Sequence, residues 1–137
     1  MSVTAEDFFN LAVCLTSAAS ETEWRSGISR GYYACFHLAR EASASFPDNT
    51  HFDIKGGTHA RLIDKFHTYR SFSAPEGKKA RQIAYALAAL KKRRERADYD
   101  ISLNLPQDEA KTAIEMVRQL QAHIKELTAM VKQTETA

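Results

Sequence analysis

The residues best able to do chemistry lie in one stretch, "LKKRRERADYD" (90–100). Five basic side chains occupy six positions from 91 to 96, and Asp98 and Tyr99 follow directly. An arginine can bind a phosphate through paired hydrogen bonds and stabilise the negative charge that develops on phosphorus during a reaction. The stretch therefore suggests chemistry on phosphate groups, with Arg94, Asp98 and Tyr99 as candidate catalytic residues.

The positive charge of the chain is concentrated around this stretch. The chain has a net charge of +2, yet positions 78 to 97 hold eight basic residues and one acidic residue. Successive residues of a helix are about 100° apart, so these side chains must spread around most of the helix. Two interpretations stay open. The stretch could be a phosphate-binding patch for nucleic acid, or a solvated helix end whose positive charges interact favourably with the helix dipole. The candidate binding residues are Lys91, Lys92, Arg93 and Arg96.

Arg94 differs from its basic neighbours because it continues an apolar stripe. Ile83, Leu87 and Leu90 repeat at helical spacing, and Arg94 is the next position on the same face. A buried guanidinium needs a partner, and Asp98, one helical turn further on, is the nearest candidate. Arg94 and Asp98 could form a structural pair that ends the helix, or Arg94 could be held in place to bind phosphate.

A second polar group lies in "ISRGYYACFHLAR" (28–40). Arg30, Tyr33 and His37 are spaced i, i+3 and i+7, which places them along one side of a helix. Arg30 and Tyr33 are candidates for nucleic-acid binding, and His37 is a candidate for proton transfer. The alternative is a histidine buried in the core or at an interface for structural reasons. Among the remaining histidines, His59 is suited to the start of a helix.

Several site classes are excluded by what the chain lacks. No phosphate-binding glycine loop, dinucleotide-binding motif or nucleophile elbow is present. Cys14 and Cys35 are predicted to be buried free thiols, and without a CxxC or HxxxH spacing we expect no metal site. We expect no cofactor. No signal sequence is visible and no apolar run approaches membrane length, so we expect a cytoplasmic protein that does not associate with membranes.

The element pattern predicts an all-α protein of one domain over residues 1–137. Apolar residues recur at helical spacing in five segments, and no segment has the period of a strand. Such amphipathic helices bury their stripes against one another, which predicts an antiparallel bundle. The predicted helices begin near Thr4, Glu21, Thr58, the end of the 71–77 loop and Pro106. Thr4 with Asp7 three residues further on resembles a capping box. Loops are predicted at 48–57 and 71–77, and an extended segment at 100–106.

Three segments together resemble the HEPN (higher eukaryotes and prokaryotes nucleotide-binding) domain superfamily. They are "ISRGYYACFHLAREA" (28–42), "GTHARLIDKF" (57–66) and "LKKRRERADYD" (90–100), followed by a long last helix. Their order and spacing resemble those of the small stand-alone bacterial and archaeal members over about residues 5–132. The resemblance implies an up-and-down helical bundle that forms a homodimer.

The resemblance also implies function. Many such proteins are metal-independent ribonucleases that use an arginine and a histidine four to six residues apart, and they act as toxins in toxin–antitoxin pairs or in other defence systems. Others bind nucleotides or partner a minimal nucleotidyltransferase. Arg94 matches the arginine, but Tyr99 stands where the histidine is expected, and no histidine occurs between 94 and 105. Tyrosine is a poor base at neutral pH, so His37 is the candidate to supply the imidazole to Arg94 and Tyr99, if its helix faces the helix of Arg94 across the dimer.

The sequence therefore predicts an RNA- or nucleotide-binding component of a toxin–antitoxin or defence module. Ribonuclease activity stays open because of Tyr99. The alternative function is a non-catalytic partner of a nucleotidyltransferase-like protein, and a purely structural interaction module is a third option.

Overall fold

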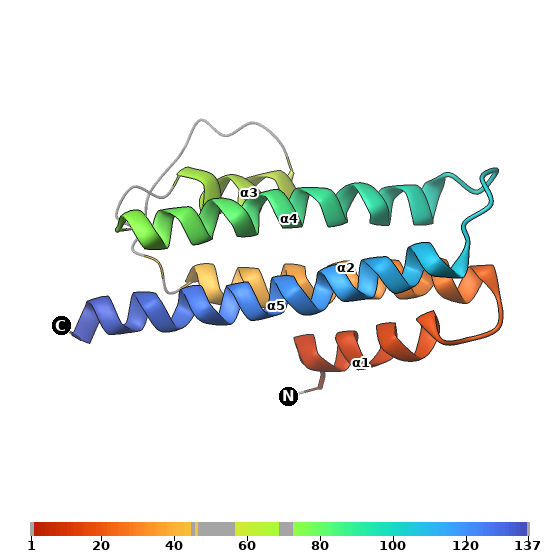
Figure 1. The fold of residues 1–137 in the computed structure, drawn as a ribbon, viewed down its shortest axis with the longest axis horizontal. Coiled ribbons are helices and arrows are strands. Elements are labelled where there is room, and N and C mark those ends of the chain that lie inside the picture. Colours follow the sequence, from red (N-terminus) through yellow and green to blue (C-terminus); the bar gives the residue numbers. More distant parts are fainter. Residues whose placement is uncertain (1, 45, 47–56, 69–72, 137) are drawn as a thin grey trace.

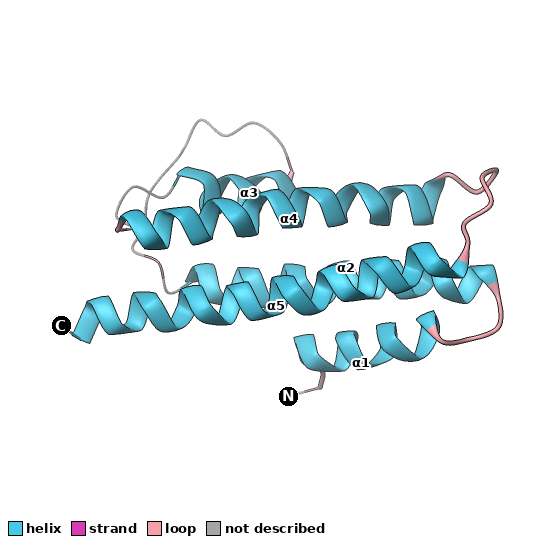
Figure 2. Cartoon of the chain, viewed as in Figure 1, coloured by secondary structure: helices cyan, strands magenta, loops and turns pink. Residues whose placement is uncertain are grey.

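The protein consists of helices and connecting turns throughout the part of the chain that the structure describes. A computed structural model describes residues 2–44, 46, 57–68 and 73–136, with side chains to residue 133. No strand occurs in these ranges, so the predicted all-α fold is confirmed (Figure 2). The elements are α1 (Ala5–Thr16), α2 (Glu21–Ala44), α3 (Thr58–Thr68), α4 (Ala74–Tyr99) and α5 (Gln107–Thr136).

Three long helices form the body of the bundle. In Figure 1, α4 runs antiparallel to α2 and α5, and the turn between α4 and α5 lies at one end of the molecule. The short α1 packs mainly against α2, and the short α3 packs mainly against α4. The core is formed where α2, α4 and α5 meet, and it is built from the predicted stripes. Its members on α5 are Ala110, Ala113, Ile114, Val117, Leu120, Ile124, Leu127 and Val131.

Two helix starts carry reciprocal caps. Thr4 and Asp7 form a capping box at α1, as the sequence predicts. Ser73 and Glu76 form another at α4, and Pro75 occupies its first turn. The prediction of a loop over 71–77 is therefore wrong for residues 74–77, because the cap at Ser73 starts α4 at Ala74.

Further differences from the predicted elements concern α1 and the α4–α5 connection. Leu103 N–H donates to Asp100 O at 3.2 Å, so the predicted extended segment begins with a turn. Cys35 is buried as predicted, but Cys14 is exposed. Helix α1 buries only Ala12 and Thr16, so Cys14 faces away from the contact between α1 and α2. Both thiols are free, and burial raises the pKa of Cys35 to about 12. The predicted loop over 48–56 lies outside the described residues.

Close approach of α1 to α2 depends on a small residue. A Cβ added at Gly27 would lie 2.8 Å from Thr16 Oγ1 and 3.1 Å from its backbone nitrogen. Any larger side chain at position 27 would push α1 away from α2. Gly27 therefore sets the distance between the two helices.

Arg25 is a buried charged residue that joins α2 to the end of α4. Its Nη1 donates to Ala97 O at 2.9 Å and to Arg96 O at 3.4 Å. Its Nη2 donates to Asp100 O at 3.1 Å and also to Leu103 O. The last carbonyl groups of a helix have no partner within the helix, and here one guanidinium supplies it.

Glu21 completes this arrangement from the first turn of α2. Its carboxylate accepts from Arg25 Nε at 3.3 Å and from Leu105 N–H at 2.7 Å. The charge of Arg25 is therefore paired, and the segment after α4 is fixed to α2 at two points. The side chains Glu21 and Arg25 thus set the position of α4 along α2.

We predict that Arg25→Met lowers the free energy of unfolding by about 3 kcal/mol or more, because it leaves the Ala97 and Leu103 carbonyls without this donor and the partly buried Glu21 carboxylate without its cation. Urea unfolding followed by circular dichroism measures the change. Arg40→Met removes an exposed arginine from the same helix and should stay within about 0.5 kcal/mol of wild type. Equal effects of the two substitutions would contradict the capping role.

Candidate functional site

Arg94 lies in the interior, as its place on the apolar stripe predicts. It is 9% exposed, and its Nη1 lies 3.6 Å from Asp98 Oδ2, one turn further along α4. Asp98 also accepts from Ser29 Oγ of α2 at 3.2 Å. The predicted partner is thus correct. Arg94 Nε, however, is buried without a hydrogen-bond partner, and a buried unpaired donor costs about 1–3 kcal/mol.

Two tyrosines of α2 supply the other contacts of Arg94. Its guanidinium carbon lies 5.5 Å from the centroid of Tyr32 and 5.6 Å from that of Tyr33. A cation over an aromatic face gains about 0.5–2 kcal/mol, more when water is excluded. These rings offset part of the cost of burying the guanidinium, but they accept no conventional hydrogen bond, so Nε stays without a partner.

The predicted row on α2 is present, and it continues to α1. Arg30 lies 5.5 Å from the Tyr33 ring and 5.4 Å from the Phe8 ring. The His37 ring is 6.3 Å from Tyr33 and 5.1 Å from Phe8. Tyr33 therefore has a guanidinium of α2 and one of α4 as neighbours.

The structure does not join all the residues that the sequence grouped around Arg94. His37 and Arg94 both neighbour Tyr33, and within the described residues no contact joins them. Tyr99 is 72% exposed, because a residue five positions after Arg94 points about 140° away around the helix. The chain therefore brings Asp98 to Arg94, whereas it leaves Tyr99 outside this group.

The histidine that lies at this site is His59, which sequence reasoning assigned only to a helix start. It comes from the first turn of α3, and its Nδ1 is 2.6 Å from Tyr32 Oη. Its ring stacks on Tyr32 at 5.5 Å and lies 4.5 Å from Phe36. No spacing in the sequence links α3 to α2, so only the tertiary contact shows this pair. We call Tyr32, Tyr33, Phe36, His37 and His59 the ring cluster.

The surroundings of the ring cluster favour neutral imidazoles. Burial lowers the pKa of His59, and Arg94 and Lys91 lower it further, while Glu95 acts in the opposite direction. Burial also lowers the pKa of His37, as do Arg40 and Arg30. Burial raises the pKa of Tyr32 well above its usual range. At neutral pH both histidines are therefore uncharged, and Tyr32 keeps its proton.

The basic stretch is spread around α4, as helical geometry requires. Lys91 pairs with Glu95 at 3.6 Å and Arg96 with Glu109 at 3.5 Å, so part of its charge is used locally. Lys92 is exposed and Arg93 half-buried. Lys91 and Lys92 line a hollow of about 420 Å³ between α3 and α4, on the helices that carry His59 and Arg94.

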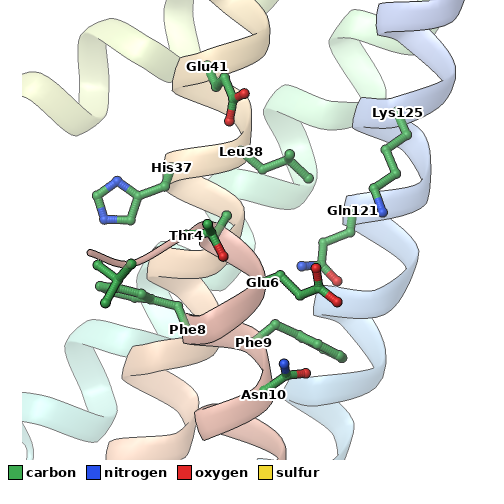
Figure 3. Close-up of a pocket in the computed structure, with 12 residues that line it drawn as sticks. Thr4, Glu6, Phe8, Phe9, Asn10, His37, Leu38, Glu41, Gln121 and Lys125 are labelled. Atoms are coloured by element: carbon green, nitrogen blue, oxygen red, sulfur yellow. The ribbon is translucent and has the colours of Figure 1, made fainter. Parts of the chain in front are cut away.

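A larger hollow surrounds the first turn of α1. It has a volume of about 900 Å³, and Figure 3 shows side chains of α1, α2 and α5 around it. Its lining combines apolar side chains with two acidic groups and one lysine, and His37 connects it to the ring cluster. The lining residues are Val3, Thr4, Ala5, Glu6, Phe8, Phe9, Asn10, His37, Leu38, Glu41, Gln121 and Lys125.

Comparison with protein-family models, curated proteins and solved structures finds no match to this chain. Within the described ranges, no group of three or more histidine, cysteine or acidic side chains is placed to hold a metal ion. None of the described helices is both long and apolar enough to cross a membrane.

We predict that Arg94→Met changes the free energy of unfolding by no more than about 1 kcal/mol, in contrast to Arg25→Met. Methionine keeps the apolar volume and removes an incompletely paired charge, while Asp98 keeps Ser29 and access to water. Urea unfolding of both variants measures the difference. A loss as large as that of Arg25→Met would mean that Arg94 and Asp98 form a structural pair.

Proposed function

We propose that this protein is a HEPN-like component of a toxin–antitoxin or defence module that binds RNA or nucleotides in the cytoplasm as a homodimer. The observation that carries the proposal is Arg94, a buried arginine whose donors are not all used by the fold. Native proteins rarely leave such donors unpaired, and a ligand is one of the partners that can complete the pairing. A phosphate oxygen is the ligand that a guanidinium binds best.

The surroundings of Arg94 suit single-stranded RNA. Unpaired bases stack on aromatic and histidine rings, and their phosphates are attracted to arginine and lysine. Tyr33, His37 and His59 are half-buried, so each retains accessible surface. Arg30 lies against Tyr33 on the same side of α2 as His37. Rings and cations thus alternate along one surface, which supports RNA over a purely structural role.

Binding is favoured over cleavage. Metal-independent cleavage of RNA needs a base for the 2′-hydroxyl and an acid for the leaving oxygen. Tyr99 points away from Arg94, and His37 contacts Tyr33 in place of Arg94. The acid–base pair that the resemblance implies is therefore not assembled around Arg94 within one chain.

We predict that the protein binds a single-stranded oligoribonucleotide and that binding weakens as salt rises. Arg94→Met should weaken it about tenfold or more. Replacing Lys91, Lys92 and Arg93 with glutamate should lower the slope of log affinity against log salt by about 2, since three phosphate contacts disappear. Fluorescence anisotropy at several salt concentrations measures both effects.

A matched control reverses the same number of charges on α5, at Lys111, Arg118 and Lys125. Affinity that is insensitive to salt, or equally weakened by the two triple variants, would contradict binding through α4. The same RNA incubated with EDTA tests cleavage in wild type, His37→Ala, Arg94→Ala and Tyr99→Phe. Cleavage that is undiminished in all three variants would reject the catalytic roles that the sequence assigns.

A second function is favoured by a separate observation. Tyr99, the last residue of α4, is 72% exposed, and Ile101 and Leu103 on the following turn are 80% and 47% exposed. Arg25 holds this turn in place, so three large apolar side chains are presented on a fixed backbone. Apolar groups gathered on a surface often mark a contact with another protein. This supports the alternative of a non-catalytic partner of a nucleotidyltransferase-like protein.

We predict that, under this alternative, the protein co-purifies with the nucleotidyltransferase-like product of a neighbouring gene. Ile101→Asp combined with Leu103→Asp should abolish the complex, because both place a charge in the contact. Co-expression with one affinity tag measures it. Val3→Asp, which adds a charge at another exposed apolar residue, is the control. Failure of the wild-type pair to co-purify would remove this function.

A further inference from the structure

The bond between Tyr32 and His59 fixes which imidazole nitrogen carries a hydrogen. Tyr32 is 1% exposed, and His59 Nδ1, at 2.6 Å, is the only hydrogen-bond partner of its hydroxyl among the described residues. A buried hydroxyl hydrogen needs an acceptor. Tyr32 O–H therefore donates to Nδ1. Because burial raises the pKa of Tyr32, this donor keeps its proton at neutral pH.

The consequence concerns the other nitrogen of His59. A neutral imidazole has one N–H and one acceptor nitrogen. With Nδ1 accepting from Tyr32, the hydrogen must lie on Nε2. His59 is half-buried, and its Nε2 has no hydrogen-bond partner among the described residues and is not one of the buried unpaired atoms, so Nε2–H is open to a ligand. Because neither nitrogen of this neutral form offers a free lone pair, His59 cannot serve as the base that removes a 2′-hydroxyl proton.

The groups around His59 select the charge of such a ligand. Tyr32 and Tyr33 face it from α2, and Lys91, Arg94 and Glu95 face it from α4. Two of these groups are positive, one is negative, and Glu95 is already paired with Lys91 at 3.6 Å. Arg94, which is also a neighbour of Tyr32, lies 3.6 Å from Asp98 through Nη1, and its Nε has no hydrogen-bond partner, so the group keeps an unused cationic donor. An anion is therefore favoured, and a cation is disfavoured.

We propose that His59 Nε2–H and the Arg94 guanidinium together bind one phosphate group, with Tyr32 as the positioning residue that sets the tautomer of His59. The proposal rests on the proposed function and assigns a binding role to His59. The phosphate can belong to a phosphodiester of RNA or to a free nucleotide, and the experiment separates these two sources.

Two substitutions of His59 test the position of the donor. Glutamine can place an N–H close to the position of Nε2, whereas asparagine can replace only the Nδ1 side that contacts Tyr32. We expect His59→Gln to bind an oligouridine within about threefold of wild type, and His59→Asn to bind it about tenfold or more weakly, the effect of losing one hydrogen bond to a charged group. Equal affinity of the asparagine variant and wild type would overturn the proposal.

Nitrogen-15 spectra of histidine-labelled protein test the tautomer without any RNA. Wild type should show His59 with hydrogen on Nε2, and Tyr32→Phe should shift His59 towards a mixture of tautomers. The spectrum of Tyr32→Phe also reports whether that variant is folded. A wild-type signal with hydrogen on Nδ1 would overturn the assignment of the donor.

Titration with inorganic phosphate, uridine monophosphate and oligouridine identifies the source. A bound anion favours the charged imidazole, so the pKa of His59 should rise from its lowered value and binding should tighten as pH falls through that pKa. Response to oligouridine alone supports a phosphodiester, and response to the monophosphate supports a free nucleotide. No response of His59 to any of the three would overturn the proposal.

The two proposals can fail separately. If RNA binding depends on Arg94 but His59→Asn has no effect, the role of His59 is wrong and the proposed function stands. If phosphate or the monophosphate shifts His59 while RNA does not bind, the phosphate site stands and RNA binding is wrong.

Discussion

The position of α4 depends on the guanidinium of Arg25, which donates to backbone carbonyls at the end of α4 and in the following turn. Glu21 compensates its charge and fixes Leu105 at the same time. Because these bonds leave little freedom for α4 to slide along α2, they also set which residues of the two helices face each other. Arg94 lies less than one turn before Ala97, whose carbonyl Arg25 holds, so its place beside Tyr32 and Tyr33 follows from this contact.

The two buried arginines illustrate different uses of the same side chain. Arg25 has a partner for each of its nitrogens, and all of them belong to the fold. Arg94 has one carboxylate at 3.6 Å, two aromatic rings and an unpaired Nε. Burying a guanidinium is costly unless its donors are satisfied. The first arrangement therefore satisfies every nitrogen of the guanidinium within the fold, and the second leaves one donor without a partner.

Local pattern predicted much of this structure, because helices leave a periodic signal in the sequence. The stripes of α4 and α5, the capping box at Thr4 and the Arg94–Asp98 pair all involve residues close in sequence. Arg25 and His59 were not recognised, because their partners are distant along the chain and no spacing connects them. The prediction that Cys14 is buried is wrong, because α1 buries only Ala12 and Thr16 and its composition does not show how little of the helix is covered. Contacts between side chains of different helices thus define the candidate site. Sequence periodicity does not reveal such contacts.

The exposed position of Tyr99 changes the meaning of the missing histidine. A side chain at position 99 leaves α4 about 140° away from Arg94, whichever residue stands there. A histidine at that position would therefore also point away from Arg94 in this chain. Asp98, four residues after Arg94, is the neighbour that helical geometry does bring to it. Position 99 instead ends α4, just before the turn that carries the exposed Ile101 and Leu103 and that Arg25 holds. Within one chain, residue 99 thus lies outside the group around Arg94, and the histidine that is hydrogen-bonded to a neighbour of Arg94 is His59 of α3, through Tyr32.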